Sequence, residues 1–233
     1  MQSKWISRGR CPCGESSNGY NIHADGHAFC FSCNKRFNNV GEAKVQSKVV
    51  EIQNRVSSTG DYGSITDRRI SEHTARKYRT KIKTNGSMIT HHYYEYFNTE
   101  GSHVATKIRQ VEGKRIWSQG DMGDALLFGQ NLFKSGGKYI TITEGEIDAM
   151  STYEMLGSKW AVVSIKNGVQ SAVQNCKQHL EYLNSFDNVV VCFDNDKPGI
   201  EASQKVAQLF EPNKCKIVRL DYKDPNEYQK LGK

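Results

Sequence analysis

From residue 136 onward, short apolar runs alternate with longer amphipathic segments. Four runs rich in β-branched residues predict strands at 139–143, 161–165, 189–193 and 216–220. The segments between them predict helices at about 147–156, 170–183 and 198–210. Strands alternating with helices form parallel sheets with right-handed crossovers. The pattern therefore predicts a parallel-sheet α/β domain over residues 136–233.

The preceding segment, residues 59–135, has a mixed pattern. Residues 65–77 predict a helix, whereas 87–97 and 104–111 predict strands. Residues 98–101 (NTEG) have the composition of a hairpin turn between these two strands. We therefore expect an α+β subdomain here.

The first 58 residues differ in composition from the rest. Residues 1–40 are rich in Cys and Gly and predict a small β domain of zinc-ribbon type. Residues 41–58 are polar, end in Ser-Ser and predict a linker. The fold class is thus α/β: a zinc ribbon, a linker, an α+β subdomain and a parallel-sheet domain.

Four cysteines near the N-terminus predict one structural Zn²⁺ site. The predicted ligands are Cys11, Cys13, Cys30 and Cys33. Four thiolates make a closed tetrahedral site, and the metal supplies folding energy to a unit this small. The first pair has one intervening residue where a zinc knuckle has two, so His23 or His27 remains an alternative to Cys11.

Two acidic stretches follow predicted strands, TEGEID at 143–148 and FDND at 193–196. Their carboxylates are Glu144, Glu146, Asp148, Asp194 and Asp196. The carboxyl edge of an open parallel sheet is where such folds bind ligands. Clustered carboxylates repel one another unless cations lie between them, and their hard oxygens suit Mg²⁺ and nucleotide phosphates. The alternative is that Asp194 or Asp196 only caps the following helix.

Net charge and hydropathy indicate which class of protein this is. The formal net charge is +7, and the excess lies in the first 135 residues. A basic N-terminal part followed by an acidic site suits an enzyme that acts on a polyanion. No apolar run is long enough to span a membrane and no signal-peptide core is present, so we expect no membrane partner and a cytoplasmic location.

The acidic stretches, with their spacing and the x-x-G after FDND, resemble the TOPRIM domain of primases, topoisomerases and related nucleases. Further motifs occur in order: DGHAFCFSC at 25–33, ITDRRIS at 65–71, ATKIR at 105–109, DALLFG at 124–129 and KDPNE at 223–227. Together they resemble the primase half of the primase-helicases of T-seven-type phages, over nearly the whole chain.

The resemblance implies a DNA primase, a nucleotidyltransferase that makes short RNA primers on single-stranded DNA from ribonucleoside triphosphates. It implies one structural Zn²⁺ and one or two catalytic Mg²⁺. A replicative helicase and a DNA polymerase are the implied partners, and a phage-encoded chain would act in the host cytoplasm.

It also implies roles for individual residues. Glu144 matches the general acid/base and is also a magnesium position, and Asp194 and Asp196 match metal ligands, with Asp224 as a further magnesium position. Lys107 and Lys114 match catalytic lysines; Lys114 is preferred to Arg115 although the spacing is one residue longer. Arg68, Arg109, Lys166 and Asn167 match positions that bind nucleotide or template.

Two other functions are alternatives to the primase. A TOPRIM nuclease or topoisomerase calls for a cleavage or ATPase module, and this sequence leaves no room for one. A catalytically silent module that binds single-stranded DNA remains the alternative, although the acidic set is intact. The sequence holds no G-x-x-x-x-G-K-[ST] loop, so the helicase motor of this family is missing; a stand-alone primase and a fragment both remain open.

Overall fold

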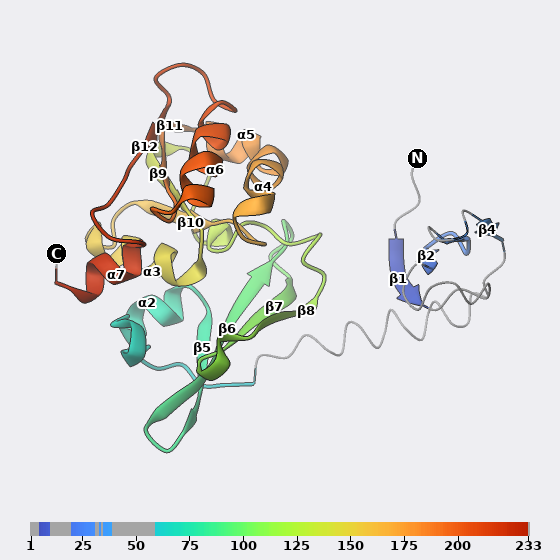
Figure 1. Ribbon diagram of the computed structural model, residues 1–233, viewed down its shortest axis with the longest axis horizontal. Helices are drawn as coiled ribbons and strands as arrows, with labels where there is room; N and C mark the ends of the chain where they lie inside the picture. The colour runs from blue at the N-terminus through green and yellow to red at the C-terminus, as the bar shows by residue number, and fades with distance from the viewer. Residues whose placement is uncertain (1–4, 10–19, 31–32, 34, 39–58, 233) are drawn as a thin grey trace. The chain divides into compact units, whose positions relative to one another are not determined.

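The computed structural model describes residues 5–9, 20–30, 33, 35–38 and 59–232 (Figure 1). The chain divides into two compact units, Met1–Arg55 and Val56–Lys233. Within the described residues, no helix has the length and apolar character needed to cross a membrane.

The first unit contains one antiparallel sheet. Its strands, in spatial order, are β1 (Trp5–Gly9), β2 (Tyr20–His23), β3 (Ala28–Cys30) and β4 (Lys35–Phe37). Tyr20, Ala28 and Cys30 are buried and form its core, with Phe37 packed against them. The predicted small β domain is confirmed, and its core among the described residues is very small.

The second unit begins with a helical turn, a short helix and an antiparallel sheet. The elements are η1 (Thr66–Arg68), α2 (Glu72–Lys77), β5 (Thr80–Asn85), β6 (Met88–Phe97), β7 (His103–Gln110), η2 (Glu112–Lys114), β8 (Ile116–Gly120) and η3 (Gln130–Leu132). The strands lie in the order β5-β6-β7-β8. The two predicted strands and their hairpin turn are confirmed, whereas β5 and β8 were not predicted because neither contains an apolar run.

The helix predicted over 65–77 is wrong in its first half. Ile65 and Ile70 exchange backbone hydrogen bonds of 2.9 and 3.2 Å across η1, so the chain turns back on itself there. Both isoleucines are buried in the core. The helix proper begins only after Ser71, whose hydroxyl accepts a hydrogen bond from the Thr74 N–H at 3.3 Å as an N-cap.

The remaining residues form the predicted parallel-sheet domain. Its elements are β9 (Gly137–Thr143), α3 (Glu146–Met155), β10 (Ala161–Ser164), η4 (Val169–Ser171), α4 (Ala172–Gln178), α5 (Leu180–Asn184), β11 (Phe186–Cys192), α6 (Lys197–Ala207), β12 (Cys215–Ile217) and α7 (Pro225–Lys230). The strand order is β10-β9-β11-β12, and every pair is parallel. The single helix predicted over 170–183 is three pieces, broken at His179, and α7 was not predicted.

The sheet separates two hydrophobic cores. Val162 and Val163 of β10 are both fully buried, but they point to opposite faces and belong to different cores. One core lies beneath α4, α5 and α6. The other joins α3 to α2 and the antiparallel sheet, so that α3 lies between α2 and β10 (Figure 1).

A glycine lets α6 approach the end of β11. A Cβ atom added to Gly199 would lie 2.2 Å from the carbonyl oxygen of Asp194, which no real contact allows. The x-x-G that follows FDND is therefore needed for the backbone to turn from the strand into the helix.

We expect Gly199→Ala to lower the free energy of unfolding by about 2 kcal/mol or more, because the added methyl group must displace backbone. Chemical denaturation measures this change. Gln204→Ala, an exposed position on the same helix, serves as the control and should change stability by less than about 0.5 kcal/mol. Equal stability of Gly199→Ala and wild type would contradict the close packing described.

Candidate active site

The sheet topology brings the two acidic stretches together. β9 and β11 are neighbours, and their last residues, Thr143 and Cys192, lie opposite each other in register. The chain then passes to α3 on one face of the sheet and to α6 on the other. Open α/β folds bind ligands at the edge where neighbouring strands send their helices to opposite faces. We call this edge, at the ends of β9 and β11, the acidic crevice. Glu144 follows the end of β9 directly, and Asp194 follows the end of β11 after one residue, Phe193.

Burial and mutual repulsion raise the pKa of these carboxyl groups. Burial, together with the charges of Asp194 and Asp196, raises the pKa of Glu144 from 4.5 to about 7. Burial and the charge of Asp224 raise the pKa of Asp194 from 3.8 to about 6, although Lys223 opposes the shift. Each carboxylate thus makes ionisation of its neighbours harder, as expected of like charges that share a site.

Asp148 belongs to the same cluster. Burial is the main cause that raises its pKa well above the usual range, followed by the charges of Asp224 and Asp194. A Cβ atom on Gly145 would lie 2.7 Å from its Oδ2 atom, so the glycine of TEGEID leaves room for this carboxyl group. The cluster therefore joins acidic residues from the ends of β9 and β11 and from the start of α7.

Two of the acidic residues also cap helices. Oδ1 of Asp196 accepts a hydrogen bond from the Gly199 N–H at 3.0 Å, and Oδ1 of Asp224 accepts one from the Glu227 N–H at 2.7 Å. Asp196 therefore caps α6, and its role as a metal ligand stays a prediction. In both caps the hydrogen bond goes to Oδ1 and orients the carboxylate, whereas Oδ2 takes no part in that bond.

Arg68, more than seventy residues before the acidic cluster in sequence, is tied to it through Asn226. The side-chain amide of Asn226 donates to the Arg68 carbonyl at 2.8 Å and to the Ser151 hydroxyl at 2.9 Å. Its backbone N–H donates to Oδ1 of Asp148 at 3.2 Å. Sequence reasoning missed Asn226, because a buried hydrogen-bonding hub leaves no local pattern.

Lys107 reaches the start of α3. Its ammonium group contacts Oε1 of Glu146, and the Tyr96 hydroxyl donates a hydrogen bond to the same oxygen. Burial and the charge of Glu146 raise the pKa of Tyr96 well above its usual value, so the hydroxyl remains a donor. Arg109 lies two residues after Lys107 on β7, on the same face of the strand. Glu146, expected to support the acidic site, is thus paired with the lysine.

The other predicted binding residues lie elsewhere in the second unit. Lys114 is exposed in η2 with a φ of 54°. Lys166 is buried, donates to the Ala125 carbonyl at 2.6 Å, and has its pKa lowered by that burial. Asn167 beside it is exposed. Among the predicted basic residues, Arg68 is joined through Asn226 to Asp148, and Lys107 contacts Glu146.

The predicted zinc ligands are described only in part. Cys30 is buried and Cys33 is partly buried, whereas Cys11 and Cys13 lie outside the described residues. The rings of the alternative ligands His23 and His27 stack with centroids 4.2 Å apart, and Nδ1 of His27 contacts Asp25.

No ready-made metal cage is present in the part of the chain that the structure describes. Within it, no three His, Cys, Asp or Glu side chains gather closely enough to hold an ion by themselves. Mg²⁺ typically takes one or two carboxylates and completes its shell with water and substrate phosphates, which the acidic crevice permits.

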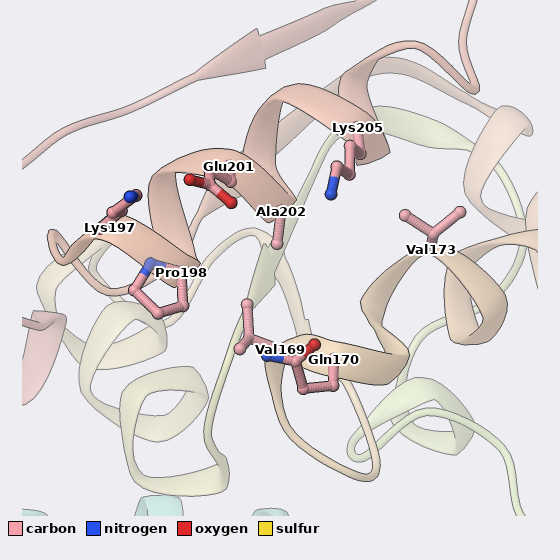
Figure 2. Close-up of a pocket in the computed structure, with 8 residues that line it drawn as sticks. All are labelled: Val169, Gln170, Val173, Lys197, Pro198, Glu201, Ala202 and Lys205. Carbon is pink, nitrogen blue, oxygen red and sulfur yellow. The ribbon is translucent and has the colours of Figure 1, made fainter.

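A small pocket of about 200 Å³ lies between α4 and α6 (Figure 2). Val169, Val173, Pro198 and Ala202 contribute apolar surface to it, and Lys197, Glu201 and Lys205 bring charges of both signs. None of the acidic residues of the crevice lines this pocket.

Comparisons with known proteins agree with this architecture. Residues 141–229 match the Toprim-like family. The chain is 33% identical over 234 residues to the "DNA helicase/primase" of Enterobacteria phage T3; the match covers 94% of this chain and spans 40% of the length of that relative.

Two solved structures are similar to the chain. The primase fragment of the bacteriophage T7 primase-helicase has a TM-score of 0.67 at 29% identity, covering 98% of this chain and 96% of that one. The second is from a complex of bacteriophage T7 lagging-strand DNA polymerase with the primase domains of two gp4 subunits bound to an RNA/DNA hybrid and dTTP. Its TM-score is 0.67 at 33% identity, covering 74% of this chain and 87% of that one. The chain belongs to the family of the primase portions of T7-type phage primase-helicases, with its Toprim domain in the second unit.

Proposed function

We propose that this chain is a DNA primase that synthesises short RNA primers on single-stranded DNA from ribonucleoside triphosphates. The observation that carries the proposal is the convergence of Glu144, Asp148 and Asp194 at the crevice between β9 and β11. Family membership supports the same activity. Two basic groups suit the phosphates of a nucleotide: the Arg68 guanidinium, which bonds to Asn226, and the Lys107 ammonium, which contacts Glu146 at the start of α3.

Glu144 suits the acid–base step of nucleotidyl transfer. A pKa of about 7 lies near the working pH, where a group both accepts and returns protons readily. In the proposed reaction Glu144 accepts the proton of the attacking 3′-hydroxyl as that oxygen bonds to the α-phosphorus and pyrophosphate departs. Asp194, Asp196 and Asp224 would hold one or two Mg²⁺ ions, which supply positive charge for the phosphate oxygens when bound.

The first unit would present the template. We propose that Cys11, Cys13, Cys30 and Cys33 hold one structural Zn²⁺, because the apolar core formed by the described residues of this sheet has three buried members and so little area to stabilise it. Arg109, Lys114, Lys166 and Asn167 remain proposed contacts for nucleotide or template. The names of the similar proteins suggest a helicase and a DNA polymerase as partners, acting in phage replication.

The primase proposal predicts primer synthesis that depends on the acidic crevice. Wild type should make short RNA products on mixed-sequence single-stranded DNA with four ribonucleotides and Mg²⁺. Glu144→Gln and Asp194→Asn should each lose about 100-fold or more of that activity, since they remove the base and a metal ligand. Glu201→Gln, exposed on α6, is the control. A folded, zinc-loaded wild type that binds DNA but makes no primer would favour the silent binding module.

The raised carboxyl pKa values predict how stability depends on pH and Mg²⁺. Because the folded-state pKa of Asp194 is about 6 against an ordinary 3.8, the folded state holds its proton more tightly. The corresponding stability is present below about pH 4 and is lost as the pH rises through about 6. Asp194→Asn should therefore stabilise the metal-free protein by about 1 kcal/mol at pH 8 and very little at pH 4.

Mg²⁺ should raise the unfolding temperature of wild type at pH 8 but not that of Asp194→Asn, because binding needs the ionised carboxylate. Thermal denaturation with and without Mg²⁺ measures both effects. Asp187→Asn, at an exposed position of β11, controls for the loss of one negative charge. A gain in stability of Asp194→Asn that is equal at pH 4 and pH 8 would contradict the assigned repulsion.

The zinc proposal predicts that Cys30→Ser releases the metal and unfolds the first unit. Metal analysis should find one zinc per wild-type chain and almost none in the variant. Proteolysis should then digest residues 1–55 while the second unit resists, because the two units have separate cores. Cys215→Ser, in the second unit, is the matched control and should retain its zinc. Full protease resistance of a zinc-free Cys30→Ser chain would contradict a structural role for the metal.

A further inference from the structure

Tyr96 lies where the antiparallel sheet meets the helix that follows TEGEID. Its side chain is 1% exposed on the inner face of β6, and its ring packs against Phe128 with centroids 5.6 Å apart. Its hydroxyl donates to Oε1 of Glu146 on α3. A buried hydroxyl needs a hydrogen-bond partner, and the partner here is a carboxylate that also contacts a lysine.

The same tyrosine contacts Lys107 in a second way. The Lys107 ammonium lies 5.5 Å from the centre of the Tyr96 ring, within the range of a cation–π contact, and it shares Oε1 of Glu146 with the hydroxyl. Lys107 comes from β7, Tyr96 from β6 and Glu146 from α3. Three elements of the second unit are therefore joined through one oxygen atom and one aromatic ring.

This arrangement restrains a side chain that would otherwise be mobile. Lysine has a flexible four-carbon stem, and holding it in a single rotamer costs up to about 2 kcal/mol of conformational entropy. Glu146 is 8% exposed, so its carboxylate depends on donors from the protein. The Tyr96 hydroxyl fixes the carboxylate, and the fixed carboxylate together with the ring fixes the ammonium group.

We propose that Tyr96 is a positioning residue for nucleotide binding: through Glu146 and its own ring it holds the Lys107 ammonium at the start of α3, two residues after Glu144 in sequence, ready for the triphosphate of the incoming nucleotide. The proposal rests on the proposed primase function and adds to it a residue that does not itself touch substrate. Tyr94 offers a natural comparison, because its side chain lies on the same face of the same strand. The Tyr94 hydroxyl lies 3.1 Å from Nδ1 of His92 and does not bond to α3.

The test is a double-mutant cycle between Tyr96 and Lys107. Values of kcat and KM for ribonucleotides in primer synthesis, and the dissociation constant of a ribonucleoside triphosphate, are measured for wild type, Tyr96→Phe, Lys107→Met and the double variant. Tyr96→Phe keeps the ring and removes the donor. We expect it to lower kcat/KM roughly tenfold, as the loss of a hydrogen bond to a charged group does.

Non-additivity is the decisive readout. If Tyr96 acts through Lys107, the double variant is no more impaired than Lys107→Met alone, whereas a general loss of packing multiplies with it. Tyr94→Phe should retain wild-type kinetics. Unfolding temperatures are measured for every variant; if Tyr96→Phe does not fold, Glu146→Gln takes its place in the cycle.

The failure of this inference is distinguishable from that of the primase proposal. Primer synthesis by wild type combined with wild-type kinetics in Tyr96→Phe, or with multiplicative losses in the cycle, overturns the role of Tyr96 and leaves the primase standing. If wild type makes no primer but binds nucleotide, the cycle on the dissociation constant decides the role of Tyr96. If wild type neither makes primer nor binds nucleotide, both proposals fail.

Discussion

The repulsion between carboxylates at one edge of a parallel sheet is the constraint on which the rest of the second unit depends. Burial and neighbouring charge raise the pKa values of Glu144 and Asp194 to about 7 and about 6, so ionising the site opposes folding. The surrounding structure offsets part of this cost with backbone donors, as at the caps formed by Asp196 and Asp224. Lys223, 3.7 Å from Asp194, offsets a further part. The remaining repulsion favours a cation, which ties the stability of the site to its function.

The sequence predicts the parts of the fold that are set locally. The parallel strands are continuous β-branched runs because both of their faces are buried, as Val162 and Val163 show. The predicted helix at 65–77 failed because Ile65 and Ile70 are buried by pairing with each other, and a helical pattern of apolar residues does not distinguish this from a helix face. Strands β5 and β8 escaped prediction because tertiary pairing, not composition, makes them strands.

The candidate site, too, has features that the sequence predicts and features that it does not. Glu144 and Asp194 were predictable because each lies within two residues of the end of its strand, and two adjacent parallel strands end together. The hydrogen bonds of Asn226 to Arg68 and of Tyr96 to Glu146 were not, since each joins residues far apart in sequence. Their position depends on how α3 and α7 pack, which no local pattern encodes. Local chemistry thus predicts which groups react, whereas packing decides which groups hold them in place.

Asn226 and Tyr96 join the antiparallel and parallel parts of the second unit, and both donate hydrogen bonds through uncharged groups. Asp148 accepts its hydrogen bond from the backbone N–H of Asn226, and Glu146 accepts one from the Tyr96 hydroxyl beside the Lys107 ammonium. Another fixed cation beside Asp148 would lower the pKa of the acidic groups and compete with the magnesium ion that we propose they bind. A neutral donor orients a carboxylate and leaves its charge intact. The site can therefore be rigid and hold several carboxyl groups close together, a combination that metal-dependent phosphoryl chemistry requires.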